Sequence, residues 1–376
     1  MSTAVSLTEL CEQCSLALDS SEGLQARLLA VQRDPTDPLP LYSLARFCRR
    51  HGFINLWHSA VHIALSLPHR SPEQLWSRSD VKLTLDDWSG WSDREVRLFN
   101  PASNYFHSPY ACELIWTKQA WDGCEDLDDK TLFVVADGGF GDCLQMLRFL
   151  PDLAQRARRV IIAVRAELET FVRHNFQPPV TVVRRDCGHG LPFQRYAWAM
   201  SLAALQGRLP PFIPMRAPAP KSAPRGGAAR RRIGLCWAGS PRNPTDRRRS
   251  VAISALAPLL SRPDVEWYSL QVGDRADDIA PYSHLIEPSW HLHTFADTAN
   301  LIAALDGVIS ADTSVAHLAG NLGIPTFLML SVVSEFRWGL RRSTHWYPTV
   351  QLIRQTTPGD WSTVVRELMA GVDALD

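Results

Sequence analysis

The sequence predicts an α/β protein made of two doubly wound units that come after a short all-α N-terminal region. Three observations lead to this prediction. Short apolar runs alternate with helical patterns over residues 126–215, and the alternation restarts at residue 233. A proline-rich break separates the two series, and residues 1–75 show helical periodicity without strands. Because alternating strands and helices form parallel sheets with crossover helices, each series predicts one such sheet.

The composition describes a globular chain and excludes several classes of protein. The 376 residues are 45% hydrophobic and 21% charged, enough for two or three domains with real cores. Lys+Arg and Asp+Glu balance at 39 each, so no net charge favours nucleic acid. The first residues lack the basic and apolar segments of a signal peptide, and no window approaches ~18 apolar residues. We expect a cytoplasmic protein without a transmembrane segment or a nucleic-acid partner.

The eight cysteines are scattered, and Cys11-x-x-Cys14 is the only close pair. A structural zinc site needs a second pair of ligands, which the sequence does not supply. Reduced thiols are therefore expected, and a metal or redox role for Cys11 and Cys14 is the less favoured interpretation.

Residues 1–75 predict a degenerate tetratricopeptide-like helical region. Two apolar helix faces are broken at Gly52 and closed by Pro68, the arrangement of one helix–turn–helix repeat. Such repeats bury their faces only by stacking, so this one is expected to pack on the next part of the chain or to bind a protein partner.

Residues 76–125 are rich in tryptophan, and two interpretations stay open. The five residues are Trp76, Trp88, Trp91, Trp116 and Trp121. The favoured interpretation is a helical cap that packs these large rings on the next domain. The alternative is an acceptor-binding surface, where tryptophan stacks on sugar rings.

The strands and helices expected in the two units are deduced from apolar runs and helical spacing. In the first unit, residues 126–215, strands are expected at Thr131–Ala136, Val160–Val164 and Val180–Val183, with helices from Asp142 and at Glu167–His174 and Trp198–Leu205. Residues 216–232, within the proline-rich stretch Pro210–Arg232, predict an interdomain linker. In the second unit, residues 233–376, strands are expected at Ile233–Ala238, Trp267–Val272, Leu285-Ile286, Gly307–Ser310 and Pro325–Leu330, with helices at Ile253–Leu260, Ala296–Leu305 and Ser314–Leu322. Two such units leave a cleft between the carboxyl edges of their sheets, where these folds bind ligands.

The glycine-rich turn Asp137-Gly138-Gly139-Phe140-Gly141-Asp142 is the first candidate site. It joins a buried strand to a helix whose unpaired N–H groups favour an anion or a carboxylate held above the sheet. Asp142-x-x-Gln145 also fits a capping box, so Asp142 has a capping and a catalytic interpretation, which are compatible.

The second unit carries a corresponding turn and an arginine-rich loop. Asp312-Thr313-Ser314 opens a helix, and His317 lies one turn in; phosphate binding and plain N-capping with a satisfied histidine both remain open. After strand Ile233–Ala238 come Gly239, Ser240, Arg242, Arg247 and Arg249. Arginine clusters are usually solvated, but at this strand end their guanidinium forks suit a diphosphate. Gln271 lies at the end of the next expected strand, and from this position alone we expect it to contact the ribose or base of a nucleotide.

Several motifs are absent from the sequence. It contains no Gly-x-x-x-x-Gly-Lys-Ser/Thr loop, no Gly-x-Gly-x-x-Gly fingerprint after any strand and no Gly-x-Ser-x-Gly. The acidic stretch Asp126–Asp129 precedes a strand, so it does not support a metal site at the carboxyl edge.

Taken together, the motifs resemble the bacterial tetratricopeptide-linked glycosyltransferases whose catalytic region is similar to glycosyltransferase family 9, the heptosyltransferase family. The similarity runs from about Trp121 to Trp361 and is carried by Trp121-Asp122-Gly123, Gly139-Phe140-Gly141-Asp142, Leu147-Arg148-Phe149-Leu150-Pro151, Gly234-Leu235-Cys236-Trp237-Ala238-Gly239, Asp246-Arg247-x-Arg249-Ser250, Phe295-Ala296-Asp297-Thr298, Ser310 to Gly320, Trp338, Trp346-Tyr347-Pro348 and Gly359-Asp360-Trp361.

This resemblance implies a GT-B fold, in which two Rossmann-like domains face each other across a cleft. It implies a metal-independent enzyme without a cofactor, with the acceptor on the first unit and the nucleotide-sugar on the second. Asp142 is similar to the family's general base, with Asp137, Gly139 and Gly141 on the acceptor side, and Asp312–His317 is similar to its diphosphate site. Relatives usually carry Glu-Gln where this chain has Asp137-Gly138, which implies altered acceptor choice or weak activity.

The sequence leaves three hypotheses for the function. The first is an inverting glycosyltransferase that moves a sugar from a nucleotide-diphosphate donor to a hydroxyl of a glycan or protein acceptor, with Asp142 as base. The second is an inactive GT-B scaffold that binds a partner through its Trp-rich helical front. A sugar-nucleotide epimerase is the third and least favoured.

Overall fold

The computed structural model describes residues 22–99, 119–186, 190–219, 230–243, 246–287 and 292–375. Cys11, Cys14, Trp116 and residues 220–229 of the expected linker lie outside these ranges. The chain divides into two compact units. Unit 1 contains the described residues 22–99 with Val332–Leu340 and Thr356–Pro358, and unit 2 contains the other described residues from 119 onward.

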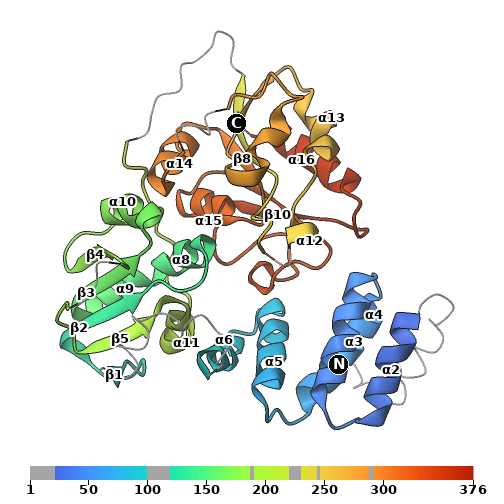
Figure 1. The fold of residues 1–376 in the computed structure, drawn as a ribbon, viewed down its shortest axis with the longest axis vertical. Helices are drawn as coiled ribbons and strands as arrows, with labels where there is room; N and C mark the ends of the chain where they lie inside the picture. Colours follow the sequence, from blue (N-terminus) through green and yellow to red (C-terminus); the bar gives the residue numbers. More distant parts are fainter. Residues whose placement is uncertain are drawn as a thin grey trace. The chain divides into compact units, whose positions relative to one another are not determined.

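Unit 1 is helical over its N-terminal part (Figure 1). Its elements are α2 (Glu22–Arg33), α3 (Pro38–Arg50), α4 (Ile54–Ser66), α5 (Pro72–Thr84), α6 (Gly90–Arg94) and the 3-10 helix η2 (Glu95–Phe99). Asp37 caps α3, and Ser71 forms a capping box with Gln74 at the start of α5. Gly52 has φ +80°, which lets the chain reverse between α3 and α4 without the strain of a side chain.

The segment Val332–Leu340 belongs to unit 1 although it comes after a strand of the second sheet. Phe336, in the 3-10 helix η8 (Phe336–Trp338), packs edge-on against buried Trp91 at 5.6 Å between ring centroids. The guanidinium of Arg94 lies 4.0 Å from the ring of Phe336 and 4.1 Å from that of Trp76. Trp91, from the region expected to be a cap, thus packs on this later segment, which the sequence placed in the second α/β domain.

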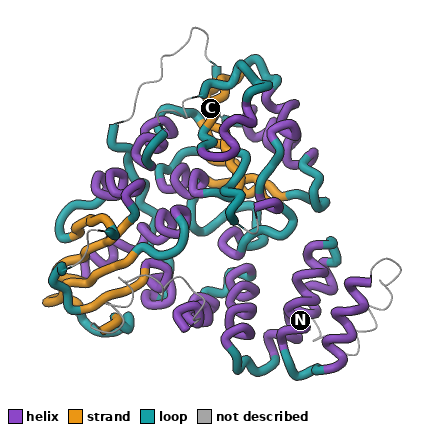
Figure 2. Tube along the Cα trace, viewed as in Figure 1, coloured by secondary structure: helices purple, strands orange, loops and turns teal. Residues whose placement is uncertain are grey.

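Unit 2 contains two five-stranded parallel sheets flanked by helices (Figures 1 and 2). The first sheet has the order β1-β5-β2-β3-β4 and the second β10-β9-β8-β6-β7. The first half contains β1 (Gln119–Ala120), β2 (Leu127–Val135), β3 (Ala157–Val164), β4 (Val180–Arg184) and β5 (Arg195–Trp198), with α8 (Phe140–Met146), α9 (Leu150–Arg156), α10 (Ala166–Asn175) and α11 (Leu202–Gln206). The second half contains β6 (Arg231–Cys236), β7 (Val265–Ser269), β8 (Gly307–Ala311), β9 (Thr326–Leu330) and β10 (Val350–Arg354), with α12 (Asp246–Arg249), α13 (Ala257–Leu260), α14 (Phe295–Ile302), α15 (Ser314–Asn321) and α16 (Ser362–Asp373). The prediction of an α/β protein with two parallel sheets is confirmed.

In each sheet, the chain adds strands first to one side of a central strand and then to its other side. In the first, β2 lies between β3 and β5, and in the second β6 lies between β7 and β8. At such a switch point the connections leave to opposite faces, which opens a crevice at the carboxyl ends of the strands. The turn after β2 and the loop after β6 therefore start where ligands bind.

Some elements differ from the sequence-based expectation. Residues Trp198–Leu205 were expected to be one helix, but Arg195–Trp198 forms β5 and pairs with β2, and only Leu202–Gln206 is α-helical. Ile286 contributes a single bridge to Tyr268 instead of a strand. Pro258 falls in the first turn of α13, and the helix expected over Ile253–Leu260 divides into a 3-10 turn and α13. Proline has no N–H to donate, which accounts for the interruption.

We expect Ile161→Ala to lower the free energy of unfolding by about 2–5 kcal/mol, because a large apolar side chain is removed from the buried centre of β3. Ile213→Ala is the matched control in the same unit, since Ile213 is 61% exposed. It should change stability by less than about 0.5 kcal/mol. Thermal unfolding of the two variants measures the difference, and equal losses would contradict the assignment of this core.

Candidate active site

A cavity of about 260 Å³ lies at the carboxyl ends of three strands of the second sheet. It is lined by Cys236, the last residue of β6, and by residues that come after β6, β7 and β8: Ala238–Arg242, Leu270–Asp274 and Thr313–Val315. The cavity is therefore at the switch point between β6 and β8, the position at which open parallel sheets bind ligands.

Gln271 joins the ends of β6 and β7 behind this cavity. Its side chain is 4% exposed, and Oε1 accepts a hydrogen bond from the Ala238 N–H at 2.9 Å. Its Nε2 donates to the Val272 carbonyl at 3.3 Å. Gln271 is thus a framework residue of the cavity wall as well as a lining residue, a role that its position alone did not predict.

Asp246 holds the arginine-rich loop against the strand end. It is 2% exposed, accepts a hydrogen bond from Ser250 Oγ at 2.7 Å and forms ion pairs with Arg249 at 3.5 Å and Arg275 at 3.4 Å. The Arg249 side chain also donates to the Asp312 carbonyl at 3.0 Å, which links the loop after β6 to the loop after β8. A buried carboxylate with two cationic partners is satisfied, so it fixes this loop instead of repelling a bound anion.

Gly239 is required by this packing. A Cβ at Gly239 would lie 2.5 Å from an Arg249 nitrogen and 2.7 Å from Asp246 Oδ1. Its N–H donates to Ser250 Oγ at 2.9 Å. The absence of a side chain here lets the guanidinium of Arg249 lie directly over the end of β6.

The start of α15 forms another wall. Thr313 is the N-cap, and its Oγ1 accepts a hydrogen bond from the Val315 N–H at 3.3 Å and lies 3.2 Å from Ser310 Oγ. The prediction that Thr313 caps this helix is therefore confirmed. Capping orients the first turn of the helix, which lines the cavity at Ser314 and Val315 and carries the partial positive charge of a helix N-terminus.

Asp142 sits in the first turn of α8, at the carboxyl end of β2. Its Oδ2 accepts a hydrogen bond from the Gly139 N–H at 2.6 Å. The capping box predicted over Asp142 and Gln145 is therefore wrong: the helix begins at Phe140, so Gly139 is the N-cap and Asp142 is the third helical residue. Gly138 has φ +80°, and a Cβ there would lie 2.5 Å from the same Oδ2. Only glycine at this position leaves room for the carboxylate.

Asp137 is buried and serves the framework. It is 4% exposed, and its Oδ1 accepts a hydrogen bond from the Met200 N–H at 2.8 Å. That bond joins the end of β2 to the segment that comes after β5. Asp137 thus stabilises the switch point of the first sheet beneath the glycine turn.

Gly141 brings the two halves of unit 2 together. A Cβ at Gly141 would lie 2.8 Å from His317 Cδ2 and 3.7 Å from the Cα of Ser314, so α8 approaches the first turn of α15 at this glycine. His317 is 4% exposed, and its Nδ1 hydrogen-bonds Tyr347 Oη at 2.9 Å. Nearby, Asn321 Nδ2 donates to the Leu144 carbonyl at 2.8 Å between the same two helices.

The structure brings together part of the predicted site. Six predicted residues line the cavity: Gly239, Ser240, Arg242, Gln271, Thr313 and Ser314. Arg249 and Asp312 do not line the cavity but are hydrogen-bonded to each other. Arg247 is exposed, and His317 is not a lining residue. Gly141, the residue before Asp142, approaches this assembly at Ser314 and His317.

Sequence reasoning missed Asp246, Tyr347 and Asn321 as residues that build the site. Each contacts a partner from a distant segment, which no local pattern reveals. The sequence did contain a signal for Asp246: an acidic residue inside an arginine cluster predicts an ion pair within that cluster.

The two cysteines next to the site are not reactive thiolates. Burial raises the pKa of the Cys143 thiol to about 12, and the Asp137 and Asp142 carboxylates add to the rise. Burial likewise raises the pKa of Cys236. Both thiols are therefore protonated at neutral pH and act as small apolar side chains.

Within the described ranges, no three or more His, Cys, Asp or Glu side chains are grouped to hold a metal ion. None of the helices in the same ranges has the length and apolarity needed to cross a bilayer.

Comparisons with known proteins give distant similarities. No protein-family profile matches the chain. Protein FlbA of Caulobacter vibrioides is 25% identical over 332 residues, which cover 77% of this chain and 54% of that protein, so the chain spans about half the length of this relative. Among solved structures, a glycosyltransferase family 9 protein of Veillonella parvula is 11% identical with a TM-score of 0.48, covering 68% of this chain and 92% of that one. The heptosyltransferase WaaC of E. coli with ADP is 12% identical with a TM-score of 0.46, covering 65% of this chain and all (100%) of that one.

We expect Gly141→Ala to destabilise the protein by about 1–3 kcal/mol, because the new methyl group meets the ring of His317 in a packed contact. The control is the same substitution in a His317→Ala background, where the ring is gone. A double-mutant cycle by thermal unfolding should show that most of the cost disappears there. Additive losses would mean that the two residues do not meet.

Proposed function

We propose that the chain is a nucleotide-sugar-dependent glycosyltransferase of the inverting, metal-independent kind with a GT-B arrangement. The observation that carries the proposal is the approach of Gly141, next to Asp142, to Ser314, which lines the cavity after β8. This approach supports the proposal that the arginine-lined cavity and the Asp142 carboxylate belong to one site built from both sheets. This is the arrangement that a reaction with an anionic leaving group and a proton-donating acceptor needs.

In the proposed reaction, the diphosphate of the donor lies in the cavity after β6 and β8. Arg242 lines that cavity, and so does the first turn of α15, whose helix N-terminus favours an anion. Arg249 and Arg247 add positive charge in the same loop. When the bond from the anomeric carbon to the phosphate oxygen breaks, these groups stabilise the negative charge that the nucleoside diphosphate gains.

Asp142 is the proposed base. As the acceptor hydroxyl attacks the anomeric carbon, its proton passes to the Asp142 carboxylate and the new glycosidic bond forms. The Gly139 N–H holds one carboxylate oxygen in place, which orients the base for this transfer. Attack and departure on opposite faces of the sugar invert the anomeric centre.

Arginine and backbone N–H groups take the role of a metal ion in this proposal. Activity should therefore persist in the presence of EDTA.

We expect Asp142→Asn to reduce transfer by about 10²–10⁴-fold, because asparagine cannot take the proton. Asparagine keeps an oxygen that accepts from the Gly139 N–H, so the fold should be retained. Affinity for ADP and other nucleoside diphosphates, measured by calorimetry, should stay within about twofold of the unchanged protein. Full transfer activity in this variant would remove Asp142 as base.

We expect Arg242→Gln to weaken nucleoside diphosphate binding by about 10–100-fold, the value of a lost charge-assisted hydrogen bond. Arg248→Gln is the matched control, since Arg248 is exposed in the same loop and does not line the cavity. Calorimetry should show little change in the control. A chain that binds no nucleoside diphosphate at all would instead support the scaffold hypothesis.

A further inference from the structure

The glycine turn that carries Asp142 is also contacted by an arginine from the next strand of the first sheet. Arg165 directly follows β3, which pairs with β2, and its Nη2 donates a hydrogen bond to the Gly138 carbonyl at 2.9 Å. Its guanidinium lies 5.0 Å from the centroid of the Phe140 ring, at the start of α8. The side chain is thus held between an aromatic ring and a backbone carbonyl at the carboxyl edge of the sheet.

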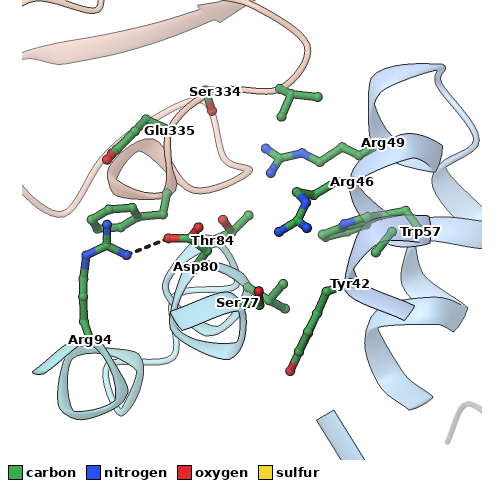
Figure 3. Close-up of a pocket in the computed structure, with 14 residues that line it drawn as sticks. Tyr42, Arg46, Arg49, Trp57, Ser77, Asp80, Thr84, Arg94, Ser334 and Glu335 are labelled. Carbon is green, nitrogen blue, oxygen red and sulfur yellow. Dashed lines mark hydrogen bonds and ion pairs between the residues drawn. The ribbon is translucent and has the colours of Figure 1, made fainter. Parts of the chain in front are cut away.

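Other arginines of the chain pair with carboxylates. Arg173 forms an ion pair with Glu169 at 2.6 Å on α10, the helix that follows Arg165. Arg94 in unit 1 pairs with Asp80 at 2.6 Å (Figure 3). Among the described residues, Arg165 has no such ion pair, and its hydrogen bond goes to the turn. Its guanidinium therefore acts on a peptide group and not on an acidic side chain.

The peptide group between Gly138 and Gly139 connects Arg165 to Asp142. Its carbonyl accepts from Arg165, and its N–H donates to Asp142 Oδ2 at 2.6 Å. A trans peptide group is planar, and its C=O and N–H point in opposite directions. One rigid group therefore has the guanidinium at one end and the carboxylate at the other. A charged donor on the carbonyl also polarises the peptide, which strengthens the hydrogen bond that its N–H makes.

Glycine on both sides gives this peptide group unusual freedom to rotate. Rotation of the peptide plane changes ψ of Gly138 and φ of Gly139, and neither residue has a Cβ that opposes the change. Gly138 already has φ +80°. A rotated peptide would turn its carbonyl oxygen toward the carboxylate and remove the bond to Asp142 Oδ2. The hydrogen bond from Arg165 favours the orientation in which the N–H faces Asp142.

We propose that Arg165 is a positioning residue for Asp142, which it orients through the Gly138–Gly139 peptide group. The inference rests on the proposed function, because the orientation of Asp142 matters for transfer only if Asp142 is the base. When Arg165 is present, the peptide N–H holds the carboxylate at the end of β2, ready to take the proton of the acceptor. When Arg165 is absent, the peptide group occupies both orientations and the carboxylate loses its fixed position, which slows proton transfer.

The first test follows the Gly139 amide by NMR and needs no substrate. The chain contains 21 glycines, so selective ¹⁵N-glycine labelling of the full chain gives a spectrum in which Gly139→Ala identifies the signal. In Arg165→Met, the Gly139 amide should exchange with solvent about tenfold faster, because its bond to Asp142 is open more of the time. Arg173→Met, at an exposed arginine of α10, is the control and should leave this rate unchanged. An unchanged Gly139 amide in Arg165→Met would overturn the proposal.

The second test measures hydrolysis of nucleotide-sugars, in which water replaces the acceptor. The probes are ADP-heptose, UDP-N-acetylglucosamine and GDP-mannose, and the readout is the release of nucleoside diphosphate. Arg165→Met should lower kcat about 10–100-fold and change KM by less than about twofold. In an Asp142→Asn background the same substitution should cause no further loss, because the base on which Arg165 acts is already gone.

The outcomes separate this inference from the proposed function. Full hydrolysis by Asp142→Asn would overturn the proposed function and, with it, the role of Arg165. An inactive Asp142→Asn together with a fully active Arg165→Met would overturn this inference alone. Tenfold weaker ADP binding by Arg165→Met in calorimetry would show that Arg165 binds the donor directly, which would also end the proposal. A lower melting temperature with an unchanged Gly139 amide would make Arg165 a residue that only stabilises the fold.

Discussion

The contact between α8 and α15 is the constraint on which the proposed active site depends. Gly141 has no side chain, so the two helices meet at the ring of His317, and Asn321 closes the contact by donating to the Leu144 carbonyl. Each helix begins at the carboxyl end of a strand near its sheet's switch point. The contact holds the start of α8, which carries Asp142, near the start of α15, which lines the cavity of the second sheet.

Several polar residues near the proposed site are buried and have partners within the fold. Tyr347 orients His317, Asp137 ties the strand end to Met200, and Asp246 holds the arginine loop. A buried polar group without a partner would lower the stability of the fold. Because each of these side chains has a partner, it fixes the position of the segment that it contacts. The groups that remain at the cavity wall, Arg242 and the first turn of α15, are those that an anionic ligand can reach.

Unit 1 shows the opposite pattern. Its polar groups are paired around Asp80, Arg94 and Glu335, while Arg49 is buried with its charge unmatched among the described residues. Arg49 lines a cavity of about 220 Å³ in this unit, whose wall also includes residues from Val332–Leu340, the segment that comes directly after β9 (Figure 3).

The sequence by itself determined the α/β class, the two series of strands and helices, and the local chemistry of the glycine turn and of the helix start at Thr313. These depend on spacing within ten or so residues, where periodicity, capping and glycine conformations act. Only the tertiary structure decided that Arg195–Trp198 is a strand, that Val332–Leu340 joins the helical unit, and that Arg49 is buried without an ion pair among the described residues. Those outcomes depend on partners distant in the chain, because strand pairing and burial are settled by packing that no local pattern encodes.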